Sequence, residues 1–147
     1  MKLLPIFIVL AAAGCGTRHL DQEIVQDGPW TDNTEGQFCK SMAFQYGGQA
    51  VVTFRGGDGD VEIPASYAVS EAKVAAGMVE VRYEATEVHQ ERYRAALVRW
   101  KSAHEVDART WPAELPKSET FQATARPGLT LVRADGTIIK LSARWEH

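Results

Sequence analysis

The sequence predicts a mainly β protein, a small antiparallel barrel or sandwich with one helix near residues 86–105. Two observations carry this prediction. Short segments in which apolar and polar residues alternate, as in half-buried strands, recur along the chain. Turn-forming pairs, notably Gly47-Gly48 and Asp135-Gly136, separate several of these segments. Six or more short antiparallel strands in one domain favour a barrel or sandwich, and an α+β fold is the alternative.

The first predicted hairpin begins at residue 37 and turns at the glycine pair. Residues 56–60 are interpreted as a flexible turn, because their glycine–aspartate pattern occurs only once. Residues 61–76 are ambiguous, because Ile63-Pro64 begins an edge strand or a turn and residues 66–76 fit either a short helix or a pair of irregular strands. Residues 78–85 alternate as one half-buried strand. The hairpin's predicted apolar face carries Phe38, Met42, Phe44 and Tyr46, then Ala50, Val52 and Phe54, with Cys39 on the opposite face.

Residues 86–105 favour a helix, because their apolar residues share one side of a helical wheel and Thr86 is a suitable N-cap. Aromatic and β-branched residues in this segment keep a strand as the other reading. A loop over 108–117 then leads to a three-stranded meander. The predicted apolar side of the helix is Tyr93, Ala96, Leu97, Trp100 and Ala103, and the last strand is expected to point Ile139, Leu141, Ala143 and Trp145 inward.

The first fifteen residues have the layout of a secretory signal, in which one positive charge at Lys2 precedes a short apolar run. The run is shorter than the roughly 20 residues that a membrane-spanning helix needs. Small residues before Cys15 resemble the lipobox of bacterial lipoproteins, with Ala12 where that family usually has leucine. The resemblance implies cleavage before Cys15 and lipid on its thiol. Gly16 after the cysteine then favours an outer membrane location, facing the periplasm, in an organism with two membranes.

This organisation predicts a lipoprotein signal peptide over residues 1–14, a lipid anchor and flexible tether over 15–36, and a single β-rich domain over 37–147. The formal net charge of −3 makes nucleic acid an unsuitable partner, since binding to phosphates requires clustered positive charge. Cys39 has no second cysteine left to pair with and is expected to be a small buried residue. The scattered histidines predict no metal site or cofactor, and no catalytic motif is found.

Large tryptophans are the candidates for ligand contact, although core packing is their usual role. Gly28-Pro29-Trp30 ahead of the first strand and Arg144 on the last resemble the Gly-x-Trp motif and late-strand arginine of lipocalins. The resemblance implies an eight-stranded barrel in which the tryptophan packs across the base against the arginine. The ligand-binding candidates are Trp30, Trp100 and Trp145.

The leading hypothesis is a membrane-anchored envelope lipoprotein that acts as a binding module for a protein partner or an apolar small molecule. The alternative is an inhibitor or immunity-type protein against a cell-wall hydrolase or periplasmic toxin, in which Asp58 and Asp60 would enter a basic active site. An enzymatic activity stays an open and less favoured reading, because no catalytic constellation is found.

Overall fold

The computed structural model describes residues 19–57, 59–73 and 76–143. The predicted signal peptide (residues 1–14) and the predicted lipidation site Cys15 lie outside these ranges, as do Arg144 and Trp145. The proposed packing of a base tryptophan against Arg144 therefore falls outside the described residues.

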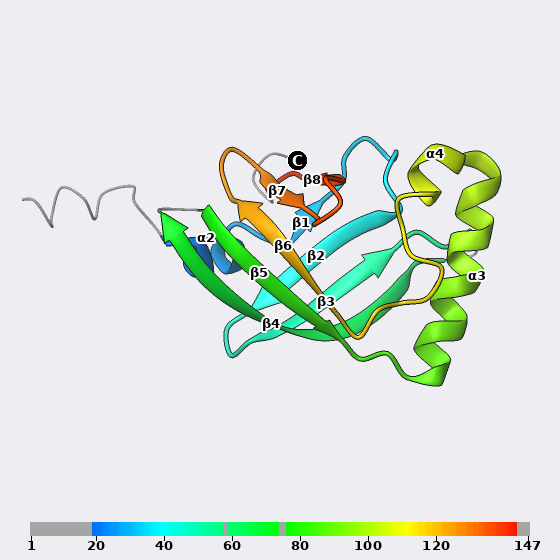
Figure 1. The fold of residues 1–147 in the computed structure, drawn as a ribbon, viewed down its shortest axis with the longest axis horizontal. Coiled ribbons are helices and arrows are strands. Elements are labelled where there is room, and N and C mark those ends of the chain that lie inside the picture. Colours follow the sequence, from blue (N-terminus) through cyan, green and yellow to red (C-terminus); the bar gives the residue numbers. More distant parts are fainter. Residues whose placement is uncertain (1–18, 58, 74–75, 144–147) are drawn as a thin grey trace, which may run out of the picture.

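The described chain forms one eight-stranded antiparallel sheet in which the strands follow one another in chain order. The sheet curls into a barrel (Figure 1), so the mainly β prediction is confirmed and the barrel alternative is the observed one. The strands are β1 (Trp30–Thr31), β2 (Cys39–Gln45), β3 (Gln49–Phe54), β4 (Val61–Lys73), β5 (Ala76–Tyr83), β6 (Ser118–Thr124), β7 (Leu129–Val132) and β8 (Ile138–Leu141).

A single bridge between the first and last strands nearly closes the barrel. Thr31 N donates to Ser142 O at 3.0 Å, and Ser142 N donates to Thr31 O at 2.8 Å. These two hydrogen bonds pair backbone groups that an open sheet would leave as an exposed edge. An eight-stranded antiparallel barrel of this kind is compatible with a lipocalin-like architecture.

Side chains fill the barrel interior. Inward-facing residues alternate along the strands, as with Val79, Val81 and Tyr83 on β5, all of which are buried. A cluster of aromatic rings occupies the end nearest the long helix, with neighbouring centroids 5.0–5.7 Å apart. The rings of this aromatic cluster belong to Phe38, Phe54, Tyr93 and Trp111.

One departure from strict alternation corrects the predicted hairpin. The register shifts between Cys39 and Ser41, which is the signature of a β-bulge. Lys40 is the extra residue, so Cys39 is fully buried like Met42 although strict alternation would place the two on opposite faces, and Phe38, which precedes β2, is fully buried as well. Tyr46, predicted on the apolar face, lies at the turn instead and is 70% exposed.

The ambiguous segment after residue 60 is one long strand, β4, and neither a helix nor a strand pair. It pairs with β3 from Val61 to Ser66 and with β5 from Ala65 to Lys73. Gly77 permits this close pairing, because a Cβ at that position would lie 2.3 Å from the Ser70 carbonyl oxygen.

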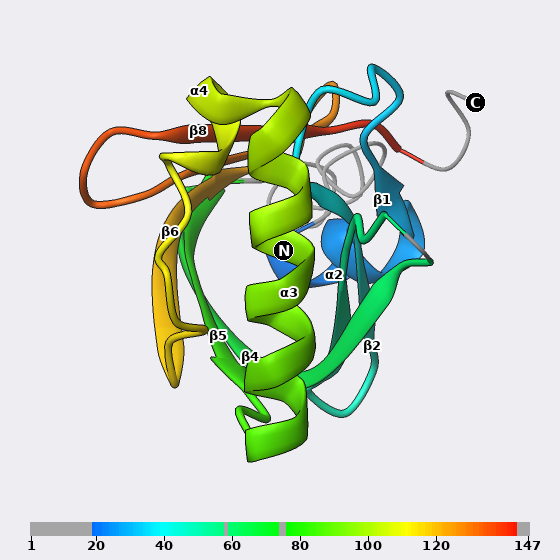
Figure 2. The ribbon, with the colours of Figure 1, turned by 90° about the vertical axis from the view of Figure 1, so that its right-hand side faces the viewer.

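The helix predicted over residues 86–105 is confirmed as α3 (Glu87–Ala103), and the hydroxyl of Thr86 accepts a hydrogen bond from His89 N at 3.2 Å. A short helix, α4 (Glu105–Ala108), follows it. Figure 2 shows α3 lying across one end of the barrel, where Tyr93 and Ala96 are buried. The predicted apolar stripe ends early, because Ala103 is exposed.

A second helix, α2 (Leu20–Gln26), lies at the opposite end of the barrel from α3 (Figure 1). The prediction of a flexible tether over residues 15–36 is wrong for residues 20–32, which pack against the barrel. Leu20, Ile24 and Trp30 are fully buried, and Glu71 of β4 accepts a hydrogen bond from Leu20 N at 2.6 Å. Seven residues are too few to show a helical period, so contacts with the barrel specify this helix. In the described ranges, no helix is long and apolar enough to cross a membrane.

Candidate binding site at the α3 end of the barrel

A pocket of about 470 Å³ opens between the last turn of α3 and the loops that follow β1 and β3. Its volume falls in the range of small-molecule and peptide side-chain sites. One wall is aromatic and comes from α3, and the rest is lined by charged side chains of both signs. The residues used below are Lys40, Arg55, Asp60, Arg99, Trp100 and His104.

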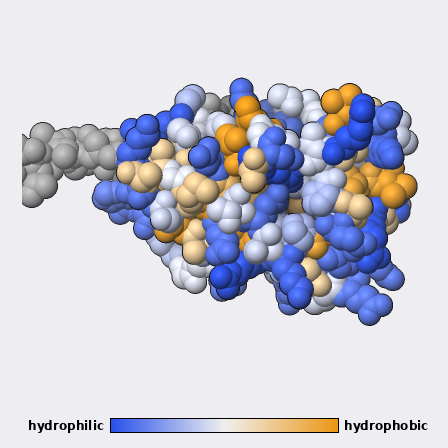
Figure 3. All heavy atoms as spheres, viewed as in Figure 1, coloured by the Kyte–Doolittle hydropathy of each residue, from blue (hydrophilic) through white to orange (hydrophobic). Residues whose placement is uncertain are grey.

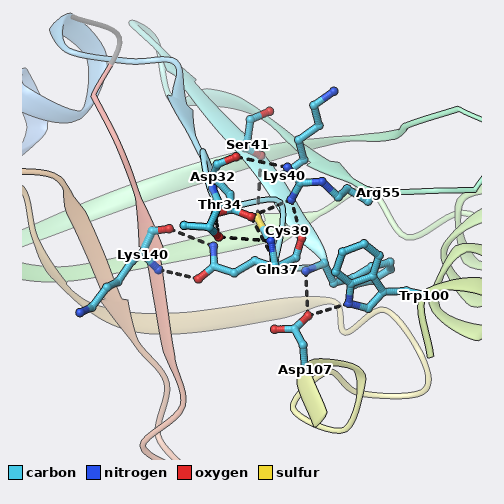
Figure 4. A network of polar contacts seen from close by, with 12 residues as sticks. Asp32, Thr34, Gln37, Cys39, Lys40, Ser41, Arg55, Trp100, Asp107 and Lys140 are labelled. Carbon is cyan, nitrogen blue, oxygen red and sulfur yellow. Dashed lines mark hydrogen bonds and ion pairs between the residues drawn. The ribbon is translucent and has the colours of Figure 1, made fainter. Parts of the chain in front are cut away.

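The aromatic wall is a stacked pair on α3. The rings of Trp100 and His104 are 3.7 Å apart between centroids and 7° from parallel. Residues four apart on a helix face the same side, which brings these two rings together. Trp100 Nε1 also donates to Asp107 Oδ2 at 2.8 Å, and the same oxygen accepts from Phe38 N at 2.8 Å (Figure 4). Asp107 therefore holds the indole in one orientation relative to the barrel.

A buried ion pair supports the floor of the pocket. Arg55 Nη1 lies 2.8 Å from Asp32 Oδ2 and 2.6 Å from the Gln37 carbonyl oxygen, to which it donates. The guanidinium carbon lies 6.0 Å from the Trp100 ring centroid, in reach of a cation–π contact. Figure 4 shows this network joining the chain after β1, the end of β3 and α3.

The Asp32 carboxylate is held in its charged form. Burial alone would raise its pKa, but hydrogen bonds from the Thr34 hydroxyl, the Thr34 and Gln37 backbone N–H groups and Arg55 outweigh burial. The net effect is a pKa below the ordinary value of 3.8. Arg55 is therefore matched by a full negative charge at neutral pH.

The rim of the pocket is more loosely held. Lys40 Nζ lies 2.5 Å from Asp60 Oδ2, and both side chains are about two-fifths exposed (40% and 39%). Ion pairs with this exposure contribute about 0–1 kcal/mol to stability, so a ligand can open this one at little cost. Asp60 is thus already paired within the protein, and Asp58 lies outside the described residues.

The thiol behind this network is buried and protonated. Cys39 is the nearest thiol behind the network, but burial raises its pKa to about 12, so it is not a thiolate at neutral pH. Within the described ranges, no three His, Cys, Asp or Glu side chains are grouped so as to hold a metal ion. A flat aromatic wall beside an exposed ion pair is suited to a planar apolar group that carries a neighbouring charge.

The structure separates the three tryptophans predicted to contact ligand. Trp100 lines the pocket and is partly buried. Trp30 is fully buried near α2, where its Nε1 donates to the Ile24 carbonyl oxygen at 2.9 Å, so it is part of the core. Trp145 lies outside the described residues.

Sequence reasoning missed the polar residues that build the site. Asp32 and Arg55 are far apart in the chain, and no local pattern pairs them. Asp107 and His104 follow α3 in a segment read mainly for helical period. A usable signal was the spacing of Trp100 and His104, which places two aromatic rings on one face of a helix.

Comparison with protein-family models, with curated proteins and with solved structures found no match to this chain. The fold and the pocket are therefore the basis on which a function is inferred.

Proposed function

We propose that this protein is a binding module of the bacterial envelope, anchored by lipid on Cys15, and that the pocket beside Trp100 holds a segment of a partner protein. The anchor rests on the lipobox-like sequence ending at Cys15. The binding role rests on the small barrel and on one observation above all. The pocket pairs a fixed aromatic wall with charged side chains at the surface.

The packing favours a surface partner over an apolar ligand enclosed in the barrel. The aromatic cluster fills the barrel interior at the α3 end with buried side chains of the protein itself. Hydrophobic residues also lie over α3 and α4 at the surface (Figure 3). Val98 on α3 and Val106 on α4 are 70% and 73% exposed. Exposed apolar side chains on two successive helices occur on many protein-binding surfaces.

The pocket's chemistry defines the segment that it fits. The Trp100–His104 wall offers a flat surface to an aromatic or proline side chain. The exposed Lys40–Asp60 pair at the rim can open, so Lys40 can instead pair with an acidic neighbour in the partner segment. We therefore expect a partner with an exposed loop or terminus in which an aromatic residue adjoins an aspartate or glutamate.

Site-specific photo-crosslinking in cells that make the full-length protein tests the pocket. A crosslinking amino acid at Arg99, which lines the pocket, should give a discrete protein adduct that Trp100→Ala abolishes. The matched control position is Arg92, which is exposed on the same helix and outside the pocket lining. The same adducts at both positions, or an adduct that Trp100→Ala leaves unchanged, would contradict the proposal.

The anchor is tested separately, by intact mass measurement of the protein purified from membranes. The expected mass lacks residues 1–14 and carries acyl groups on Cys15, and Cys15→Ser should release the protein from the membrane fraction. An uncleaved chain, or Cys15 without lipid, would contradict anchoring while leaving the pocket result intact.

A further inference from the structure

Arg133 occupies a position that a barrel core normally gives to an apolar residue. It continues the inward alternation of Leu129 and Leu131 on β7 and is only 7% exposed. Arginine is almost never buried to this degree unless every part of its guanidinium has a partner. Its contacts therefore require an explanation.

Three contacts fix the guanidinium in place. Nε lies 2.5 Å from Glu119 Oε2, and Nη1 donates to the Thr110 carbonyl oxygen. The Trp111 ring lies beneath it, with the guanidinium carbon 3.9 Å from the ring centroid. Glu119 is itself held, because its other oxygen accepts from the Tyr83 hydroxyl at 3.4 Å. The arginine is consequently preorganised before any ligand arrives.

The remaining nitrogen, Nη2, is buried and has no hydrogen-bond partner among the described residues. Leaving a buried donor of a charged group unpaired costs more than an ordinary hydrogen bond contributes. Natural proteins rarely tolerate this, and such atoms often mark a missing ligand or ion. The arginine borders a pocket of about 410 Å³, separate from the Trp100 pocket, which is also lined by Arg109, Thr110, Trp111, Pro112 and Glu119.

Two arginines and two acids line this pocket, so their formal charges balance, and the two arginines are held differently. Glu119 pairs with Arg133, and Asp135 stays charged at the rim, where it also accepts a hydrogen bond from Thr137 N at 2.9 Å. Arg109 lines the same pocket, is exposed, and makes no side-chain hydrogen bond or ion pair with the described residues. A carboxylate placed between the two arginines would meet one fixed and one adjustable guanidinium.

We propose that this pocket binds a small organic carboxylate, one oxygen of which accepts from Arg133 Nη2 while Arg109 contacts the other. The ring of Trp111 and the adjoining Pro112 pack against the apolar part of the ligand. Because Nη2 is out of contact with solvent, a rim side chain moves aside when the ligand binds. This site lies in a different pocket from the one proposed for the partner protein, and each stands or fails independently.

Nuclear magnetic resonance of the full-length protein with ¹⁵N-labelled arginine tests the site, with benzoate as the probe. Benzyl alcohol has nearly the same shape without the charge, and sodium chloride at matched ionic strength controls for screening. Benzoate should shift the Arg133 Nε–H resonance saturably. Benzyl alcohol should bind at least about tenfold more weakly, since a charged hydrogen bond is lost.

Two variants and one control variant complete the test. Arg109→Ala removes an exposed side chain, should leave folding unchanged, and should weaken benzoate binding several-fold, whereas Arg92→Ala should not. Arg133→Lys keeps the charge but loses the planar fork, and should abolish binding if circular dichroism shows it folded. Equal affinity for benzoate and benzyl alcohol, no saturable shift, or an Arg109→Ala variant with unchanged affinity would overturn the proposal. The absence of a saturable shift would mean that water alone satisfies Nη2.

Discussion

Removing the Asp32 carboxylate should be among the most destabilising polar substitutions in this protein. The Asp32 side chain is 2% exposed and its partner Arg55 is 15% exposed. The carboxylate accepts hydrogen bonds from Thr34 N at 3.0 Å, the Thr34 hydroxyl at 2.6 Å, Gln37 N at 3.0 Å and Arg55 Nη1 at 2.8 Å. Breaking a buried pair by removing one partner costs about 3–5 kcal/mol, because the other charge is left uncompensated.

We therefore expect Asp32→Ala to lower the free energy of unfolding by about 3–5 kcal/mol, with Asp32→Asn intermediate at roughly 2 kcal/mol. Urea unfolding followed by circular dichroism measures both. Asp60→Ala is the matched control, because its exposed pair with Lys40 should be worth less than about 1 kcal/mol. A loss for Asp32→Ala no larger than that for Asp60→Ala would refute the reasoning.

The same carboxylate predicts a dependence of stability on pH. Its pKa lies below 3.8 in the folded protein, so folding favours the charged form. The stabilisation is present above the unfolded-state pKa and is lost as the pH falls through the lower folded-state pKa. The difference in stability between the wild type and Asp32→Asn should accordingly be constant near neutral pH and shrink below about pH 4. A difference that is unchanged down to pH 2 would contradict this assignment.

Three further predictions concern the packing of side chains and strands in the barrel. Trp30→Ala should lower the free energy of unfolding, measured in urea, by about 3–5 kcal/mol. Trp30→Phe should lower it less, because it loses mainly the hydrogen bond to the Ile24 carbonyl oxygen, and equal losses for the two variants would contradict this. Gly77→Ala should lower the melting temperature, because the Cβ of the new alanine would lie 2.3 Å from the Ser70 carbonyl oxygen. An unchanged melting temperature would contradict this, since it would mean that β4 and β5 move apart without cost. Cys39 should not react with a maleimide at pH 8 in the folded protein, because burial raises its pKa to about 12, and it should react once urea unfolds the protein. Fast labelling of the folded protein would contradict the burial of this thiol.

Local patterns predicted the elements of this fold well. The hairpin around Gly47, the strand over residues 78–85, the terminal meander and the Thr86-capped helix were all anticipated. Each is specified within about a dozen residues, by apolar residues that recur every 2 or 3.6 positions and by residues that favour a turn or a helix cap. Trp100 lines the pocket, and its role as a ligand contact stays a prediction.

The failures have a common physical cause. The bulge at Cys39 shifts the alternation by one residue, and a period of two does not anticipate it. Helix α2 is too short to form alone and is stabilised by burial of Leu20 and Ile24 against the barrel. Arg133, which directly follows β7, is charged yet buried, and its partner Glu119 lies on another strand, so local alternation did not predict the pair.

The chain's local periodicities were thus sufficient to specify a β-rich domain with one long helix, because they depend on neighbouring residues alone. Closure of the barrel through Thr31 and Ser142 depended on the tertiary structure, as did the pairing of Asp32 with Arg55. The packing of the Arg133 guanidinium on the Trp111 ring likewise forms only in the folded chain. These contacts join segments 20 to more than 100 residues apart in the chain, and their energy is available only once the whole barrel has brought the partners together.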